Sequence, residues 1–159
     1  MKSKYNILGI RDIEKLNKER KDKKVIFTNG CFDILHYAHM KLLHVAKSHG
    51  DILVIGLNSD KSVKLNKGSE RPILNENQRM YSLHLFNIVD YIILFDEKTP
   101  MELIKKVNPD ILVKGKDWQN KIVGEDYVLE RGGEIILVDL LPDISTSIII
   151  DKCRSMHSS

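Results

Sequence analysis

Five short apolar runs alternate along this chain with longer segments of helical spacing, and this alternation limits the folds open to it. Each run is rich in Ile, Leu and Val and is apolar on both faces, which is typical of strands that helices cover on two sides. Strands that alternate with helices are joined by right-handed crossovers and lie parallel in one sheet. The five predicted strands are Lys24–Thr28, Ile52–Asn58, Tyr91–Phe95, Ile111–Lys114 and Glu134–Val138.

The segments between these runs carry helix signals that agree with the arrangement. Asn75 is suited to cap one helix, and Thr99 followed by Pro100 is suited to begin another. We therefore predict a single-domain α/β fold, a Rossmann-like, doubly wound, parallel five-stranded sheet with helices on both faces. The predicted divisions are a leading helical segment over residues 1–23, the folded domain over 24–152 and a C-terminal tail over 153–159.

The composition narrows the classes of function. The length of 159 residues suits one domain, and a net charge of +3 from 25 basic and 22 acidic side chains gives no case for a nucleic-acid partner. The start of the chain is too polar for a signal peptide, and no apolar run reaches the roughly 18 residues of a membrane helix. The two cysteines, Cys31 and Cys153, form no disulfide framework. We expect a cytoplasmic protein without a membrane partner.

Two histidines stand where the first predicted strand passes into a helix, in the stretch "GCFDILHYAHM". The spacing of three residues puts His36 and His39 on one side of a helical turn. Zinc is weakly supported because the pair supplies only two ligands, and no G-x-S-x-G elbow supports a nucleophilic triad. A merely structural pair is a further alternative. Phosphate binding fits the strand end, the helix dipole and the side-chain type together, although both glycine-rich nucleotide signatures are absent.

Several blocks of the sequence, in the right order, resemble one known family. "GCFDILHYAH" resembles the G-x-F-D-x-x-H-x-G-H signature of the HIGH-type, cytidylyltransferase-like nucleotidyltransferases, and "ISTSIII" resembles their distal I-S-T-T-x-I motif. The blocks "KGSERPI", "NPDILVKGKDW" and "IVGEDYV" are similar to the adenylyltransferase domain of bacterial ADP-heptose synthases. The resemblance extends from about Val25 to Ile150, and it implies a nucleotidyltransferase domain over residues 24–152.

The resemblance implies the transfer of a nucleotidyl group from a nucleoside triphosphate to a sugar phosphate, with release of pyrophosphate. It implies these catalytic residues: His36, His39, Lys67 and Arg79. It implies that three stretches bind the nucleotide, namely Thr28, Asn29, Gly30, Cys31, Phe32 and Asp33, then Lys114, Gly115, Asp117 and Trp118, and finally Ser145, Thr146 and Ser147. The residues predicted to bind the sugar phosphate are Asn58, Asp60 and Arg71. Mg²⁺ is expected to bridge the triphosphate, and no metal-ligating side chain is predicted.

The residues alone leave alternatives to several of these assignments. Lys61, Lys64 and Arg71 compete with Lys67 for the basic role in the loop. Arg79 has a possible ion-pair partner in Glu76, three residues earlier on the same helix. Asp33 is suited either to orient a histidine or to fix the turn after the strand. Trp118 is suited either to the core or to stacking on a base.

The sequence departs from the family's signatures at three positions. Ala38 replaces the glycine between the two histidines, Asp143 replaces the glycine before the distal motif, and Ser147 replaces its second threonine. Alanine is the better helix former, so we expect the added methyl to affect nucleotide contact rather than folding. A carboxylate beside a triphosphate is unfavourable unless it points away or helps to hold a cation.

The function expected from the resemblance is transfer of AMP from ATP to D-glycero-D-manno-heptose 1-phosphate, for NDP-heptose and surface-polysaccharide precursors. One alternative is a glycerol-3-phosphate cytidylyltransferase or another relative that uses CTP or GTP. A nucleotide-binding module without catalysis is a second alternative. We also expect a homodimer, since small symmetric assemblies are common.

Overall fold

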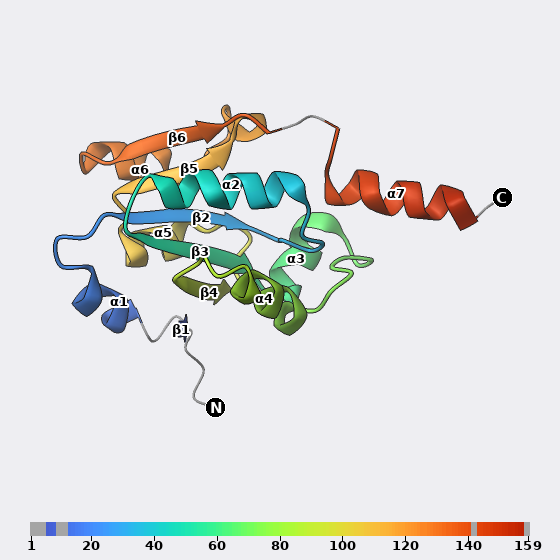
Figure 1. The fold of residues 1–159 in the computed structure, drawn as a ribbon, viewed down its shortest axis with the longest axis horizontal. Coiled ribbons are helices and arrows are strands. Elements are labelled where there is room, and N and C mark those ends of the chain that lie inside the picture. The colour runs from blue at the N-terminus through green and yellow to red at the C-terminus, as the bar shows by residue number, and fades with distance from the viewer. Residues whose placement is uncertain (1–5, 9–12, 141–142, 158–159) are drawn as a thin grey trace.

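A six-stranded, wholly parallel sheet forms the centre of the protein (Figure 1). The computed structural model describes residues 6–8, 13–140 and 143–157. The strands are β1 (Asn6–Leu8), β2 (Val25–Gly30), β3 (Ile52–Asn58), β4 (Tyr91–Phe95), β5 (Ile111–Gly115) and β6 (Glu134–Val138). The helices are α1 (Ile13–Arg20), α2 (Tyr37–Ser48), α3 (Asp60–Lys67), α4 (Glu76–Leu85), α5 (Met101–Val107), α6 (Glu125–Glu130) and α7 (Thr146–His157), with a short 3-10 helix over Lys116–Trp118.

The structure confirms the α/β fold class and all five predicted strands, and it adds a sixth. β1 has three residues and pairs with β4 at the edge of the sheet. A three-residue strand is too short to display the alternation or the apolar run from which the other strands were predicted. The strand order is β1-β4-β3-β2-β5-β6, so the order reverses direction between β2 and β5.

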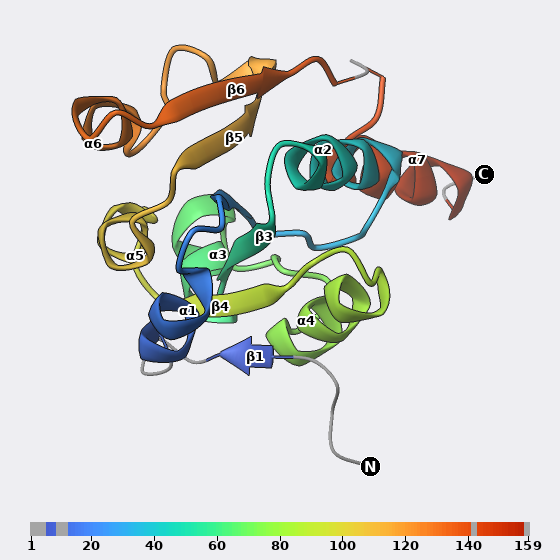
Figure 2. The ribbon, with the colours of Figure 1, turned by 60° about the vertical axis from the view of Figure 1, so that its left-hand side comes forward.

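Helices cover both faces of the sheet, as Figure 2 shows. On one face, α1, α5 and α6 pack around the side chains of Phe27, Val54 and Leu112. On the other face, α2 and α4 pack on alternate residues of the same strands. The burial of every residue of β3 explains why its sequence is apolar without alternation.

Aspartates fix the amino ends of the central strands. A carboxylate oxygen of Asp110 accepts a hydrogen bond from the backbone N–H of Val25 at 2.8 Å, and one of Asp90 accepts from Leu53 at 2.7 Å. Ion pairs with Arg20 and Lys47 hold these two carboxylates in place. The amino edge of the sheet is thus closed by its own side chains, whereas ligands of such folds collect at the opposite, carboxyl edge.

The leading segment belongs to the same core as the rest of the domain. Leu16 of α1 is fully buried, and Nη1 of Arg20 donates to the carbonyls of Val107 and Asn108 at 3.1 and 2.9 Å. The predicted boundary at residue 152 falls within α7, which continues to His157. Residues 1–5, 9–12, 158 and 159 of the two predicted end segments lie outside the described residues. None of the described helices combines the length and hydropathy needed to cross a membrane.

Replacement of Leu16 by alanine tests whether α1 is part of the cooperative fold. The variant removes a fully buried side chain, so we expect the free energy of unfolding to fall by about 2–5 kcal/mol. Urea denaturation measures this change, and Lys18→Ala on the exposed side of α1 is the matched control. Equal stability of the two variants would show that α1 folds separately from the sheet.

Candidate active site

The two histidines lie at the carboxyl edge of the sheet, at the start of α2. His36 occupies the N-cap position of α2, and Phe32, whose φ of 46° is left-handed, turns the chain after β2. The rings of His36 and His39 stack with centroids 3.8 Å apart and planes 24° apart. The ring of Phe32 packs against His39 at 5.1 Å between centroids. The local fold therefore presents the two imidazoles as one unit beside the N-terminus of a helix.

Burial keeps both imidazoles in their neutral form near pH 7. It lowers the pKa of His39 to about 4, with a further lowering by the charge of His36 and a hydrogen bond to the Ile34 backbone acting in the opposite direction. Burial also lowers the pKa of His36. The Nδ1 atoms of both rings are buried and have no hydrogen-bond partner. Two neutral rings with unused nitrogens, next to the positive end of the α2 dipole, are suited to hydrogen-bond an anion.

Lys114 joins the two strands at which the order of the sheet reverses. Its ammonium group donates to the backbone oxygen of Asn29 at 3.3 Å and to Oδ1 of the same residue. Burial lowers the pKa of Lys114 to about 8, although the charges of Asp117 and Cys31 act in the opposite direction. Lys114 therefore holds the end of β5 against the end of β2, and its nitrogen lies 5.9 Å from the centre of the Trp118 ring.

The stretch after β5 offers an accessible aromatic surface. Trp118 is 49% exposed, so of its two predicted roles the core position is not adopted. A Cβ at Gly115 would overlap the Asp117 carboxylate and come within 2.7 Å of Leu140, which explains why the chain has glycine there. Lys114, Gly115, Asp117 and Trp118 lie together beside the end of β2, as the nucleotide-binding prediction requires.

Asp33 fixes a turn and does not orient a histidine. Its carboxylate, almost fully buried, accepts from Nε of Arg71 at 2.7 Å and from the backbone N–H groups of Ile73 and Leu74 at 2.8 and 2.9 Å. Of the two alternatives for Asp33, the structure has the turn-fixing one. The loop after β2 is thereby tied to the loop between α3 and α4.

Arg79 lies in a different position from the one predicted for a triphosphate contact. The side chain is 0% exposed. Its guanidinium donates to the carbonyls of Leu74, Cys31 and Asn58 and to Oδ1 of Asp60, at 3.0, 2.6, 2.8 and 2.8 Å. Four of its five N–H groups are thus used within the protein. In this arrangement Arg79 holds the site together and offers no surface to a phosphate.

The same network engages two residues predicted to bind the sugar phosphate. The amide of Asn58 donates to Oγ of Ser62 at 2.9 Å, and Asp60 is the ion-pair partner of Arg79. Glu76, the partner that helical spacing offers to Arg79, instead accepts a hydrogen bond from the backbone N–H of Asp60 at 2.9 Å. Asn58 and Asp60 therefore support the loop from within, which differs from the predicted contact with substrate.

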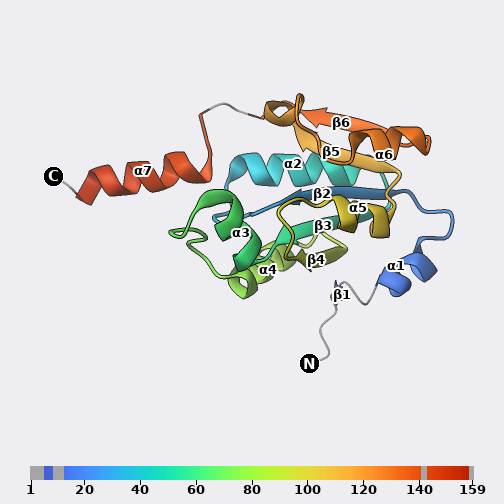
Figure 3. The ribbon, with the colours of Figure 1, turned by 180° about the vertical axis from the view of Figure 1, so that it is seen from behind.

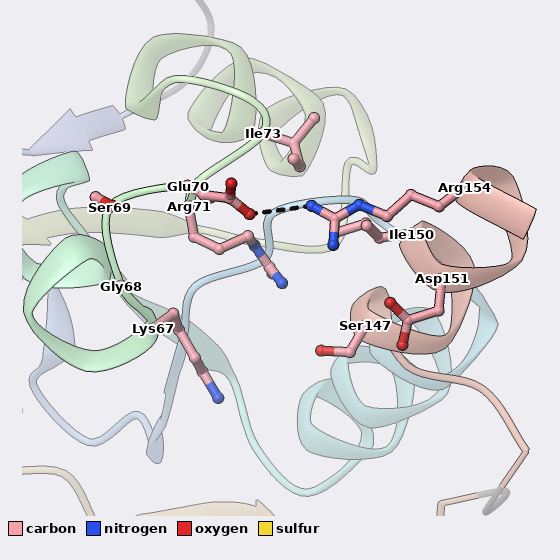
Figure 4. Close-up of a pocket in the computed structure, with 10 residues that line it drawn as sticks. All are labelled: Lys67, Gly68, Ser69, Glu70, Arg71, Ile73, Ser147, Ile150, Asp151 and Arg154. Atoms are coloured by element: carbon pink, nitrogen blue, oxygen red, sulfur yellow. Dashed lines mark hydrogen bonds and ion pairs between the residues drawn. The ribbon is translucent and has the colours of Figure 1, made fainter. Parts of the chain in front are cut away.

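A cavity of about 480 Å³ opens between the loop that follows α3 and the helix α7 (Figure 4). Its lining residues are Lys67, Gly68, Ser69, Glu70, Arg71, Ile73, Ser147, Ile150, Asp151 and Arg154. The starts of α2 and α7 and the end of α3 gather at the same end of the sheet (Figures 1 and 3). The cavity thus brings together Lys67, Arg71 and Ser147, which lie far apart in the sequence. Lys61 and Lys64, the alternatives to Lys67, line a separate depression on α3.

The remaining predicted residues fall on the ends of β2 and α7. Oγ of Ser145 accepts from the backbone N–H of Ile148 at 3.2 Å and so caps the helix that Thr146 begins. Thr28 is fully buried, and its hydroxyl has no hydrogen-bond partner. Ala38 is 4% exposed, so its methyl group faces the interior, whereas Asp143 is exposed.

Sequence reasoning missed the part of the cavity wall that follows Ser147 along α7. Asp151 and Arg154 come four and seven residues after Ser147, which is the spacing of one helical face. This periodicity was a usable signal once Ser147 had been selected. Glu70 was also missed, although it stands between Lys67 and Arg71 in the loop; no sequence pattern distinguishes it from a solvated carboxylate.

A parallel sheet with neutral histidines at a helix N-terminus and basic side chains in an adjoining cavity defines an α/β protein suited to phosphorylated ligands. In particular, the chain belongs to the cytidylyltransferase-like family of nucleotidyltransferases, which its residues 27–152 match.

Individual relatives agree with this membership. The chain is 51% identical over 137 residues to the bifunctional protein HldE of Campylobacter jejuni subsp. doylei, and the match covers 86% of this chain but 29% of that protein's length. The lipopolysaccharide core biosynthesis protein of Thermoplasma volcanium is 30% identical, with a TM-score of 0.60 over 75% of this chain and 97% of that one. The pantoate-β-alanine ligase of Francisella tularensis, 15% identical, shares the fold with a TM-score of 0.64 over 97% of this chain and 79% of that one.

Replacement of Arg79 by methionine separates a supporting role from a catalytic one. The variant leaves the Asp60 carboxylate and three backbone carbonyls without their donor, so we expect a loss of about 3–5 kcal/mol in the free energy of unfolding. Urea denaturation provides the measurement, with Asn77→Ala on the exposed face of α4 as the control. Unchanged stability combined with lost triphosphate binding would instead return Arg79 to the phosphate site.

The lowered pKa of His39 predicts a pH-dependent stability. As the pH falls from 6.5 towards 4, the unfolded chain takes up a proton at this side chain that the folded chain excludes. The free energy of unfolding should therefore decrease through this window, and the decrease should be smaller in His39→Gln. Denaturation curves at several pH values test this, with His49→Gln at the exposed end of α2 as the control. Identical pH dependence in the two variants would contradict the burial argument.

Proposed function

We propose that the chain transfers AMP from ATP to a heptose 1-phosphate, with D-glycero-D-manno-heptose 1-phosphate as the acceptor, and releases pyrophosphate. The observation that carries the proposal is the stacked, neutral pair His36 and His39 at the start of α2. The sequence resemblance to the adenylyltransferase domain of ADP-heptose synthases supports the choice of nucleotide and sugar. The name of the Thermoplasma volcanium relative, lipopolysaccharide core biosynthesis protein, supports a product destined for surface polysaccharide.

In the proposed reaction, a phosphate oxygen of the acceptor attacks the α-phosphorus of the triphosphate. The new P–O bond forms as the bond from the α-phosphorus to the bridging oxygen breaks, and pyrophosphate leaves. The acceptor phosphate is already ionised near neutral pH, so the step needs alignment and charge stabilisation rather than a strong base. His36 and His39 each donate one hydrogen bond to oxygens around the α-phosphorus, with the positive end of the α2 dipole beside them.

The nucleotide is proposed to occupy the region between the ends of β2 and β5. The exposed ring of Trp118 offers a surface on which a base can stack, and Lys114 borders the same region. Lys67 supplies a mobile positive charge from the loop, whereas the buried Arg79 acts as a positioning residue. This division of roles follows from which cationic side chains remain accessible.

Mg²⁺ is proposed to enter with the triphosphate, whose oxygens are its preferred ligands. Among the described residues, no group of three histidine, cysteine, aspartate or glutamate side chains could hold a metal ion. We therefore assign the ion no protein ligand. Its contribution when bound would be to neutralise charge on the leaving phosphates.

The chain spans 29% of the length of the Campylobacter relative, so the activity, substrates and partners of a whole protein remain part of the proposal. We propose a homodimer, which light scattering tests. A cytoplasmic location is proposed because nucleoside triphosphates are available there.

The experiment that tests the function is a substrate panel with detection of pyrophosphate. Heptose 1-phosphates and glycerol 3-phosphate are each combined with ATP, CTP or GTP in the presence of Mg²⁺. The expected result is release with ATP and a heptose 1-phosphate, and its loss when a chelator removes Mg²⁺. Release with glycerol 3-phosphate and CTP would replace the proposal with the cytidylyltransferase alternative. Nucleotide binding without release would indicate a non-catalytic module.

Replacement of either histidine by alanine should leave the fold intact and lower turnover by about 10²–10³-fold, as the loss of a transition-state donor typically does. Steady-state pyrophosphate release measures turnover, and circular dichroism verifies folding. His44→Ala, at an exposed position of α2, is the matched control. Wild-type turnover in either the His36 or the His39 variant would remove that residue from the reaction.

A further inference from the structure

One face of α7 forms the outer wall of the cavity. Ser147, Ile150, Asp151 and Arg154 follow one another at helical spacing, and all four line the cavity. Figure 4 shows Lys67 and Arg71 extending from the opposite wall towards this face. The cavity thus has a basic wall on the loop and a wall of mixed polarity on α7.

The basic wall lies next to the loop that carries the histidines. Burial raises the pKa of the Cys31 thiol, and the charges of Lys67, Arg79 and Arg71 act against that increase. Lys67 and Arg71 are therefore within electrostatic range of the segment that leads to His36. Arg71 uses Nε for Asp33, and the rest of its guanidinium extends into the cavity.

Asp151 is the carboxylate in this cavity that is free to accept a ligand. Within the described residues its side chain makes no hydrogen bond and no ion pair. Glu70, the other carboxylate of the lining, pairs with Arg154 at 3.0 Å across the mouth of the cavity. That pair is 64% and 80% exposed at its two side chains, so it contributes little to the stability of α7.

A triphosphate alone gives no reason for a free carboxylate in the cavity, since the two charges repel each other. A phosphorylated sugar does, because its phosphate pairs with cations and its hydroxyl groups donate hydrogen bonds to a carboxylate. The volume of about 480 Å³ lies within the range of small-molecule sites. The opposite chemistry of the two walls matches the two ends of such a ligand.

We propose that this cavity takes the acceptor, and that Asp151 selects it by accepting hydrogen bonds from its hydroxyl groups. The phosphate lies towards Lys67 and Arg71, and the sugar lies against α7. Asp151 is thus a specificity-determining residue on a helix that contributes no side chain to the histidine pair. The inference rests on the proposed function, because the acceptor is the sugar phosphate of that reaction.

Asp151→Asn and Asp151→Ala test the proposal in the full chain. The KM for heptose 1-phosphate at saturating ATP should rise about tenfold or more in both variants, since a hydrogen bond to a charged group is lost. The KM for ATP and kcat should stay within about twofold of wild type. The controls are Lys152→Gln, which changes α7 outside the cavity, and Asp126→Asn, which removes an exposed carboxylate from α6.

Two kinetic results would overturn the assignment. An increase in the KM for ATP, with the acceptor KM unchanged, would place the carboxylate beside the triphosphate. Unchanged kinetics in both variants would exclude any contact with substrate.

Direct binding keeps this inference distinct from the proposed function. Calorimetry measures the affinity of wild type and Asp151→Asn for heptose 1-phosphate and for inorganic phosphate. The expected result is weaker binding of the sugar phosphate and unchanged binding of inorganic phosphate, whether or not pyrophosphate is released. Equal weakening of both ligands would overturn the role of Asp151. Absence of pyrophosphate release from wild type would count against the proposed function instead.

Discussion

The buried guanidinium of Arg79 is the interaction on which the carboxyl edge of the sheet depends. Its four hydrogen bonds reach the end of β2, the end of β3 and the segment before α4, which no other described side chain connects in this way. Asp33 adds a second connection between the first and third of these segments. A planar, permanently charged group with five donors suits such a position, because the strand ends expose carbonyl oxygens that the sheet leaves unpaired.

These fixed charges explain how the histidines can be both buried and usable. Arg79 and Asp33 use their charges within the protein, so the segment between β2 and α2 is held without hydrogen bonds from the imidazole Nδ1 atoms. Burial then keeps the rings neutral, and the nearby α2 terminus supplies a positive field without a titrating group. Rigidity and charge are thus provided by different residues from those that meet the ligand, which is the arrangement that preorganised sites require.

The sequence predicted the elements whose signals are local and not those that depend on tertiary contacts. The five longer strands and the strand-to-helix position of His36 and His39 followed from apolar runs and spacing. β1 did not, because three residues carry no periodicity. Arg79 could be matched to a motif, but its burial depends on carbonyls 21 to 48 residues away in sequence. Asp151 resembled any solvated carboxylate until α7 was seen opposite Lys67.

The position of α7 has a consequence for how such a site can diversify. The helix follows the last strand and extends from the end of the sheet, away from the core (Figures 1 and 3). Its residues 151–156 are all exposed, so their side chains are under little constraint from packing. Substitutions there can alter one wall of the cavity while the strands, the histidines and the buried charges stay in place. A change of acceptor could therefore arise by drift in a single terminal helix, without passing through an unfolded or inactive ancestor.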